Sequence, residues 1–215
     1  NHLALCQYFK PPLTEHECTE KRCHGSFRWI YDYSGGQLTD IGAHFNDLAQ
    51  WGHDSEEMGP VTYDGQATFP PEGLFNTPVA FRVDCTYADG VKLIMHDKDP
   101  RTVKFEGEDG WVSVDDSGKV LAEPASLLEE AKLVVQQDYS YMQQHQRNFI
   151  ECVKSRKPTI APPEIAHRST TVCHIGNICL RLGRKLTWDP AQERFVNDAE
   201  ANGMLSRPLR EPWRL

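Results

Sequence analysis

The chain has 215 residues, a formal net charge of −8 and an ordinary globular composition, with 39% hydrophobic and 25% charged residues. This length suits one large domain or two small ones, and it allows a sizeable core without disulfides or metals. Nucleic-acid binding requires a concentrated basic face and membrane spanning requires a long apolar run, and the sequence contains neither. We therefore expect neither nucleic acid nor membrane as a partner.

The first 36 residues are of mixed character. The sequence begins with Asn rather than Met, so we expect that a start lies upstream, with room for a targeting signal or a whole domain. Residues 2–9, HLALCQYF, fit a strand, which the prolines of KPPL at 10–13 break. Residues 27–33, FRWIYDY, alternate aromatic and polar side chains and lead into Ser34-Gly35-Gly36.

Residues 37–52 have the periodicity of an amphipathic helix. At about 100° per residue, one apolar side gathers Leu38, Ile41, Phe45, Leu48 and Ala49. The nearly opposite side gathers Asp40, His44, Asp47 and Trp51.

Residues 61–122 are typical of a β-meander. AFRVDCTY at 80–87 alternates, Ala-Asp-Gly is suited to a tight turn, and VKLIMH at 91–96 returns. TVKFEG at 102–107 and GWVSVD at 110–115 flank a second turn, and KVLAE follows at 119–123. Strands joined by such short turns pair antiparallel.

Residues 125–182 predict helices again. Lys157-Pro158 ends one helix, Pro162-Pro163 begins the next, and Gly183 ends that one. KLTWD at 185–189 predicts one more short strand. The sum is a single α+β domain, 1–215, with an open, mostly antiparallel sheet and its helices on one face. The other face must be solvated or covered, so we expect a homo-oligomer through it.

The Asp40–His44 pair is the first candidate for chemistry. Four residues apart on a helix, the two side chains share a face, and a carboxylate beside an imidazole can orient it for proton transfer near neutral pH. Asp47 extends the stripe, and Gly35 and Gly36 allow close approach of a ligand to the backbone. The alternative is a solvated polar face, which any amphipathic helix has. Trp51 at the end of the stripe and the aromatic stretch before the helix favour a pocket.

Other histidines and the cysteines carry weaker signals. His167 and His174 share a helix face and suit either a pocket wall or the interior. Seven cysteines, an odd number scattered through apolar stretches, indicate buried free thiols in a reducing compartment. One cluster, His16-Glu17-Cys18 with Cys23-His24, has zinc-ligand types, but a single short segment supplies all four ligands, so we expect no metal.

No G-x-G-x-x-G, P-loop or G-x-S-x-G motif occurs. The long parallel-strand runs of a dinucleotide-binding fold are absent as well. From its own residues, the chain should bind no nucleotide cofactor.

The segment FRWIYDYSGGQLTDIGAHFNDLAQWG, residues 27–52, resembles the second domain of the Gfo/Idh/MocA oxidoreductases. FEGEDGWVSV at 105–114, the long segment 148–190 and the closing REPW at 210–213 extend the resemblance over almost the whole chain. The motif D-x-x-x-H is weak alone, but the order GG-x-x-x-D-x-G-x-H-x-x-D-x-x-x-W is specific.

The resemblance implies an NAD(P)-dependent oxidoreductase acting on a sugar, a polyol or a glycoside. The family's Asp falls on Asp40 and its His on His44, as substrate-holding and acid/base residues. We add Asp47, Gly36, Trp29 and His167 as substrate-binding residues. The family's Rossmann domain, which holds NAD or NADP, and its E-K-P lysine have no match here, so we expect this chain alone to be inactive.

Two further hypotheses stay open. One is a non-catalytic assembly module that pairs through the open sheet face. The other is an NAD-dependent glycoside-cleaving enzyme of the same family, with no net redox change. We expect a cytoplasmic location unless an upstream signal directs the protein elsewhere.

Overall fold

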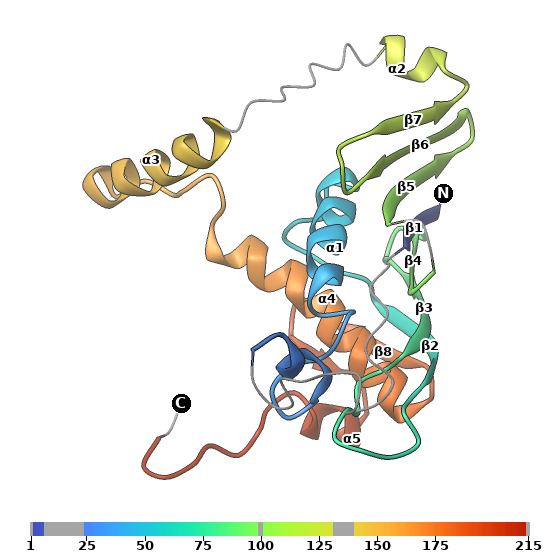
Figure 1. Cartoon of the computed structure of the whole chain (residues 1–215), viewed down its shortest axis with the longest axis vertical. Coiled ribbons are helices and arrows are strands. Elements are labelled where there is room, and N and C mark those ends of the chain that lie inside the picture. Colours follow the sequence, from blue (N-terminus) through green and yellow to red (C-terminus); the bar gives the residue numbers. More distant parts are fainter. Residues whose placement is uncertain (1, 7–23, 99–100, 131–139, 214–215) are drawn as a thin grey trace.

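A twisted sheet with a layer of helices on one face forms the body of the molecule (Figure 1). The computed structural model describes residues 2–6, 24–98, 101–130 and 140–213. The cysteine–histidine cluster that was considered and rejected as a zinc site has most of its members outside these residues. The predicted α+β class and the open, mostly antiparallel sheet are confirmed.

Nine strands form the sheet in the order β7-β6-β5-β1-β4-β3-β2-β8-β9. The strands are β1 (His2–Cys6), β2 (Thr62–Thr68), β3 (Ala80–Thr86), β4 (Lys92–His96), β5 (Thr102–Gly107), β6 (Gly110–Asp115), β7 (Val120–Glu123), β8 (Leu186–Asp189) and β9 (Arg194–Phe195). Neighbouring strands are antiparallel except β1 and β4, which are parallel. The sequence analysis missed the two-residue strand β9.

The predicted meander is interrupted at its centre. β4 and β5 follow each other in the chain but do not pair, because β1 lies between them. His2 aligns with Lys92 of β4 and with Glu106 of β5. The prediction of pairwise antiparallel neighbours was therefore wrong for this one pair and right for β3–β4, β5–β6 and β6–β7.

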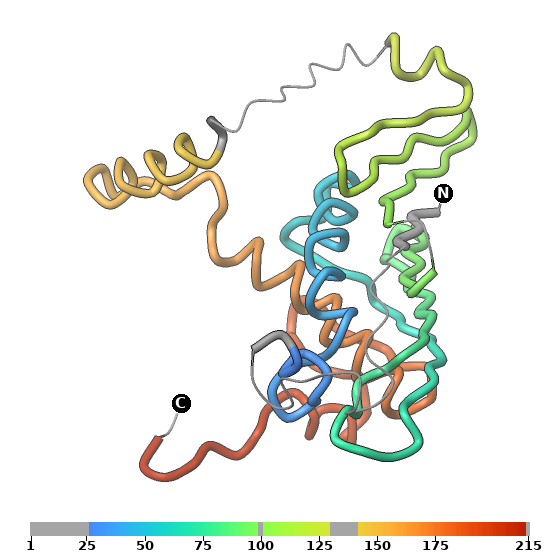
Figure 2. The backbone as a smooth tube through the Cα atoms, in the orientation of Figure 1, coloured from blue at the N-terminus to red at the C-terminus, as the bar shows by residue number. Residues whose placement is uncertain are grey.

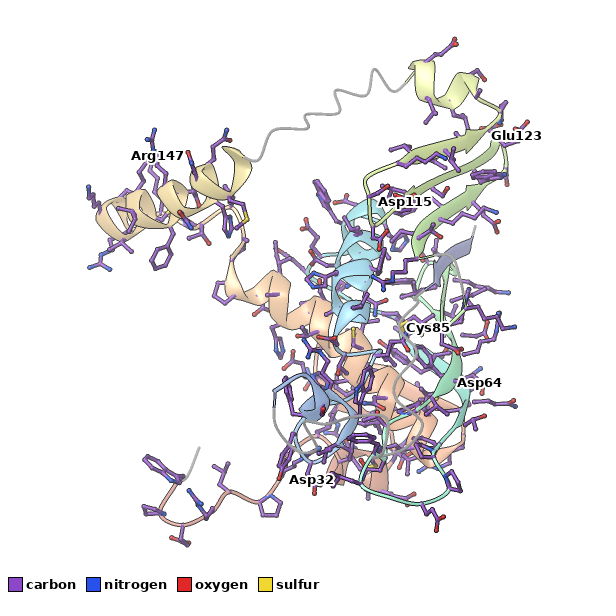
Figure 3. The ribbon with its side chains drawn as sticks, in the orientation of Figure 1. Asp32, Asp64, Cys85, Asp115, Glu123 and Arg147 are labelled. Carbon is purple, nitrogen blue, oxygen red and sulfur yellow. The ribbon has the colours of Figure 1, made fainter. Side chains whose placement is uncertain are left out.

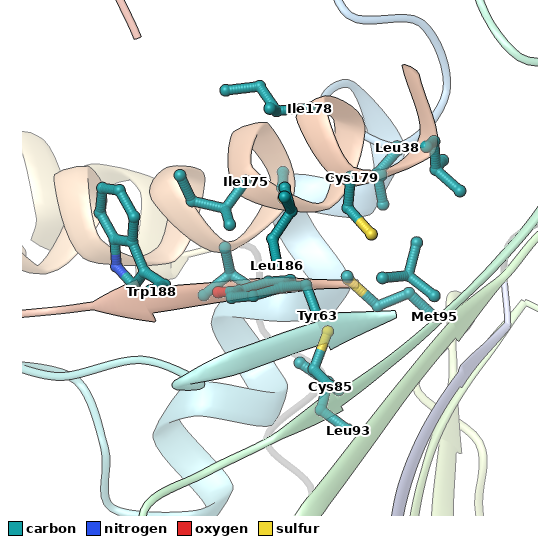
Figure 4. Close-up of a cluster of buried hydrophobic side chains, with 14 of the residues drawn as sticks. Leu38, Tyr63, Cys85, Leu93, Met95, Ile175, Ile178, Cys179, Leu186 and Trp188 are labelled. Carbon is teal, nitrogen blue, oxygen red and sulfur yellow. The ribbon is translucent and has the colours of Figure 1, made fainter. Parts of the chain in front are cut away.

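Helices α1 (Ile41–Gly52) and α4 (Pro163–Leu182) cover the sheet and enclose the core (Figure 4). Tyr63, Leu93 and Met95 from the strands meet Ile175 and Cys179 from α4, all of them buried. Strand residues alternate as a half-buried sheet requires. Figure 3 shows the result: Cys85 is on the helix side of the sheet, whereas Asp64 faces away from the helices.

The remaining helices are a 3-10 turn (His24–Trp29), α2 (Ser126–Glu130), α3 (Ser140–Ser155) and α5 (Ala199–Gly203), of which the sequence analysis missed α5. α3 stands apart from the sheet and from α1, and the last residues before the C-terminus also extend outward (Figures 1 and 2). Among the described residues, none of the helices is both long enough and apolar enough to cross a bilayer.

The predicted ends of the long helix α4 are confirmed. It begins at Pro163, and Gly183 ends it in a left-handed conformation with φ of +62°. α1 begins at Ile41 rather than at 37, because Gln37–Asp40 form a turn in which the amides of Thr39 and Asp40 donate to the Gly36 carbonyl.

Candidate functional site

The Gly35-Gly36 dipeptide sets the start of α1 against the body of the protein. The Gly35 carbonyl accepts a hydrogen bond of 2.9 Å from Asn177 Nδ2 on α4. Gly36 has φ of +77°, and a Cβ there would lie 2.6 Å from Thr77 Cβ. Both glycines are buried, so the structure gives them a packing role. The substrate-binding role predicted for Gly36 stays a prediction.

Asp40 precedes the first turn of α1 and is tied to the aromatic segment before it. Arg28 Nε donates to Asp40 Oδ2 at 2.8 Å, and both side chains are about one-third exposed. In the described part of the chain, no hydrogen bond joins Asp40 to His44. The structure therefore gives Asp40 a partner other than the predicted one, and its role in orienting His44 stays a prediction.

His44 lies in a groove between α1 and α4. This α1–α4 groove has a volume of about 420 Å³ and is lined by Ala43, His44, Asp47, Leu48, Ala166, Ser169 and Thr170. His44 and Asp47, three residues apart, are both exposed as the periodicity predicts. Leu48 was expected on the buried side, but it is more than one-third exposed and forms part of the groove wall.

Asp47 is held in place from the neighbouring helix. The buried Ser169 hydroxyl donates to Asp47 Oδ1 at 2.6 Å. This bond fixes one carboxylate oxygen of a residue that lines the groove. The groove therefore presents an imidazole and a positioned carboxylate, the two groups that bind and deprotonate a hydroxyl group.

A larger cavity adjoins the groove. It has a volume of about 570 Å³, and we call it the tyrosine chamber. Four parts of the chain form its walls. Two of them are the segment before α1 (Tyr31, Tyr33, Ser34, Gly35) and one face of α4 from His167 to Ile178. The other two are the sheet edge, with Trp188 and Glu193, and the segment 204–207. Thr170 lines both the chamber and the α1–α4 groove.

His167 and His174 both line the chamber, so the structure brings these two predicted pocket histidines together. His167 Nε2 is 2.6 Å from Glu193 Oε1, and Arg168 Nη1 is 3.0 Å from the same oxygen. Burial, with a smaller contribution from the charge of Arg207, lowers the pKa of His174 below its ordinary value. This shift favours the neutral imidazole, which can both donate and accept a hydrogen bond.

Trp29 lies inside the protein. Its side chain is 4% exposed and packs with Ile30 and Phe75 in a small second core. It is not among the residues that line the groove or the chamber. Its role in substrate binding stays a prediction.

Metal ligands do not gather in the part of the chain that the structure describes, where no group of three or more His, Cys, Asp or Glu residues could hold an ion. Cys85, Cys173 and Cys179 are buried free thiols, as predicted, and burial raises the pKa of each.

The sequence analysis missed several residues at these sites. Tyr31 and Tyr33 are not among them, because the aromatic stretch just before Gly35-Gly36 was expected to be a pocket wall or an interface, and both residues line the chamber. Ser169, Glu193 and Arg207 were missed, because their partners lie far away in the sequence.

Residues 6–215 match the family described as the oxidoreductase family, C-terminal alpha/beta domain, of the Gfo/Idh/MocA type. The chain belongs to this family. A comparison with curated protein sequences gives no match.

Solved Gfo/Idh/MocA-type structures share the fold. An aldose-aldose oxidoreductase from Caulobacter crescentus, complexed with glycerol, superposes with a TM-score of 0.62 at 15% identity, over 87% of this chain and 55% of that one. A WlbA dehydrogenase from Bordetella pertussis, in complex with NADH and UDP-GlcNAcA, gives 0.60 at 12% identity, over 87% and 54%. This chain therefore spans little more than half the length of these structures.

The residues of this chain do not fit a dinucleotide. A Rossmann site needs a glycine-rich turn between a parallel strand and a helix. The parallel strands here, β1 and β4, are joined through residues that include α1, β2 and β3, and the sequence has no G-x-G-x-x-G. The described residues therefore do not form a Rossmann-type dinucleotide site.

Proposed function

We propose that this chain is the substrate-binding domain of an NAD(P)-dependent oxidoreductase that acts on a sugar, a polyol or a glycoside. The observation that carries the proposal is the α1–α4 groove, where the exposed His44 lies on the same helix face as a carboxylate fixed by Ser169. The family of the chain and the NADH-bound WlbA neighbour support the reaction class.

The reaction class is hydride transfer between a nicotinamide, held by a Rossmann domain in the complete protein, and a carbinol carbon. Within it, His44 accepts the proton of the substrate hydroxyl or returns it. Asp47, held by Ser169, accepts a hydrogen bond from a neighbouring hydroxyl of the substrate. Asp40, held by Arg28, contributes a second carboxylate one turn away.

The test is replacement of His44 in the complete protein. We expect His44→Ala to lower kcat by ~10²-fold or more, because it removes the acid/base group. NADH absorbance with a panel of sugars and polyols measures it. His145→Ala, at an exposed histidine on α3, is the matched control and should keep full activity. Turnover of His44→Ala near that of the wild type would exclude the acid/base role. Product analysis separates net oxidation from cleavage of a glycoside.

A second candidate function is assembly, and the exposed apolar stripe of α3 favours it. Met142, Phe149, Ile150 and Val153 lie within about one-third of the helix circumference and are each about half exposed. Such a stripe marks an interaction surface more often than a solvated one. We propose that the chain forms homo-oligomers, which light scattering tests.

The buried free thiols support a cytoplasmic location as part of this proposal. Cys85, Cys173 and Cys179 are unpaired in the interior, which is the usual pattern in a reducing compartment.

A further inference from the structure

The tyrosine chamber is large, is built from four separate segments, and shares Thr170 with the α1–α4 groove. At about 570 Å³ it falls in the range of small-molecule sites. Thr170 belongs to both cavities, and its hydroxyl donates back to the Ala166 and His167 carbonyls. Its methyl group is therefore the part left to form the wall where the two cavities adjoin. A ligand that occupies both cavities would have to pass Thr170.

The chamber wall combines aromatic faces with hydroxyl and imidazole groups. Tyr33 is 55% exposed and presents an open aromatic ring, whereas Trp188 is 4% exposed and the Tyr31 ring is in contact with the guanidinium groups of Arg181 and Arg207. Polar side chains alternate with these rings along the same wall, among them Ser34 and His174. A sugar ring has this pattern in reverse, with apolar C–H faces and a rim of hydroxyls, so both of its surfaces find partners here.

The wall around Tyr31 is held rigidly. The guanidinium carbon of Arg181 lies 3.2 Å from the centroid of the Tyr31 ring, and that of Arg207 lies 4.8 Å from it. Arg207 also donates to the Asp32 and Tyr31 carbonyls at 2.6 Å each, and Arg181 donates to the Asn76 carbonyl. Such a wall is formed before a ligand arrives, which reduces the entropy cost of binding.

Two polar side chains of the chamber lining each have one hydrogen-bonding atom without a partner among the described residues. His167 is oriented through Nε2 by Glu193, which leaves Nδ1 for a further partner. Asn177, which is 2% exposed, donates through Nδ2 to Gly35, but its Oδ1 is a buried acceptor without a donor among the described residues. A ligand hydroxyl can bond to Nδ1 of His167, whereas Oδ1 of Asn177 is buried behind the lining and out of a ligand's reach.

We propose that the tyrosine chamber is a second sugar subsite, so that the substrate is a glycoside or disaccharide with its reacting ring at His44 and its second unit in the chamber. The inference rests on the proposed function for the position of the reacting ring, whereas the chamber's preference for a sugar unit stands on its own lining. The inference narrows the proposed substrates from any sugar or polyol to glycosides and disaccharides, in which two units are linked.

The experiment compares the binding of cellobiose, maltose and lactose with that of glucose and galactose, by saturation-transfer NMR titration of the complete protein. We expect at least one disaccharide to bind ~10-fold tighter than its component monosaccharides. Tyr33→Ala should remove most of that advantage and leave monosaccharide affinity within about twofold, because Tyr33 lines only the chamber. Leu121→Ala on β7, an exposed apolar residue that lines neither cavity, is the control and should change neither.

The outcomes separate the two proposals. Disaccharide binding that depends on Tyr33 without any NAD(H) turnover would support the subsite and refute the proposed function. Turnover of monosaccharides as good as that of any disaccharide, with Tyr33→Ala unchanged, would refute the subsite and keep the proposed function. Failure of every disaccharide to bind more tightly than its monosaccharides also overturns the subsite.

Discussion

At Gly36 the backbone needs a left-handed conformation and the surroundings leave no room for a side chain. The φ of +77° is one that other residues adopt only at a cost, and the Cβ position is 2.6 Å from Thr77 Cβ. The two carbons would overlap, so either Thr77 or the start of α1 must move. This turn leads directly to Asp40 and His44, so a shift there reaches the α1–α4 groove.

We therefore expect Gly36→Ala to lower the free energy of unfolding by ~2–4 kcal/mol, the sum of backbone strain and a steric clash. Urea unfolding followed by circular dichroism measures it. Gly118→Ala is the matched control, because Gly118 has φ of +80° but nothing within 4 Å of its Cβ position, so only the strain remains. Equal losses for the two variants would show that the contact with Thr77 is not significant.

Single residues of the site could be predicted from the sequence only where one helix contains them. The exposed positions of His44 and Asp47 follow from the helical period, and the structure confirms both. Their partners could not be predicted, because Ser169 approaches Asp47 from 122 residues away. Arg28, twelve residues from Asp40, gives no periodic signal either. Hydrogen bonds between elements depend on packing that a local pattern does not contain.

At the scale of elements, α1 is anchored at its far end by a buried polar cluster. Gln50 is fully buried, and its Nε2 donates to the Ser55 and Met58 carbonyls at 3.0 and 2.7 Å. Its Oε1 accepts from the hydroxyls of Ser55 and of Tyr87, which follows β3. The side chain thus satisfies four groups at once and fixes the loop after α1 to the sheet.

Gln50→Ala should lower the free energy of unfolding by ~2–4 kcal/mol, because it leaves buried donors and acceptors without partners. Chemical denaturation provides the measurement. Gln66→Ala, at an exposed position on β2, removes the same amide where water replaces it and should change stability by less than ~0.5 kcal/mol. A loss at Gln50 as small as that at Gln66 would contradict the anchoring role.

Most elements could be predicted because their patterns are local, and the arrangement of the strands could not. The alternation in β3 and β4 and the proline and glycine at the ends of α4 each fall within a short window. The insertion of β1 between β4 and β5 is a contact about 90 residues apart in sequence, as the pairing of His2 with Lys92 shows. From the short connections along the chain alone, β4 and β5 would be expected to pair with each other.

At the scale of the whole molecule, apolar surface is concentrated away from the face on which pairing was expected. The outer face of the sheet presents Asp64, Arg82 and Asp84, and the last two form an ion pair of 2.6 Å. One stripe of exposed apolar side chains lies instead on α3, which stands clear of the sheet (Figures 1 and 3). The alternation of apolar and polar residues predicts that a helix has an apolar face, but it does not predict which surface packs against that face.

We expect the chain to self-associate through α3, and the pair of changes Phe149→Asp and Ile150→Asp to make it monomeric, because two charges would be buried without partners. Light scattering at several concentrations measures the mass. Arg82→Glu tests the sheet face in parallel and should leave the oligomer intact. A wild-type chain that stays monomeric at high concentration would argue against assembly, and loss of the oligomer only in Arg82→Glu would assign it to the sheet.

The central place of β1 gives the sheet an unusual mechanical arrangement. In the described strands, one block of three (β5, β6, β7) and one block of five (β2, β3, β4, β8, β9) are joined edge to edge only through this five-residue strand. Force applied to the backbone ahead of His2 acts on the middle of the sheet rather than on a free edge. Any folded unit fused there would therefore transmit its movements into both blocks at once, and peeling β1 away would divide the sheet in two.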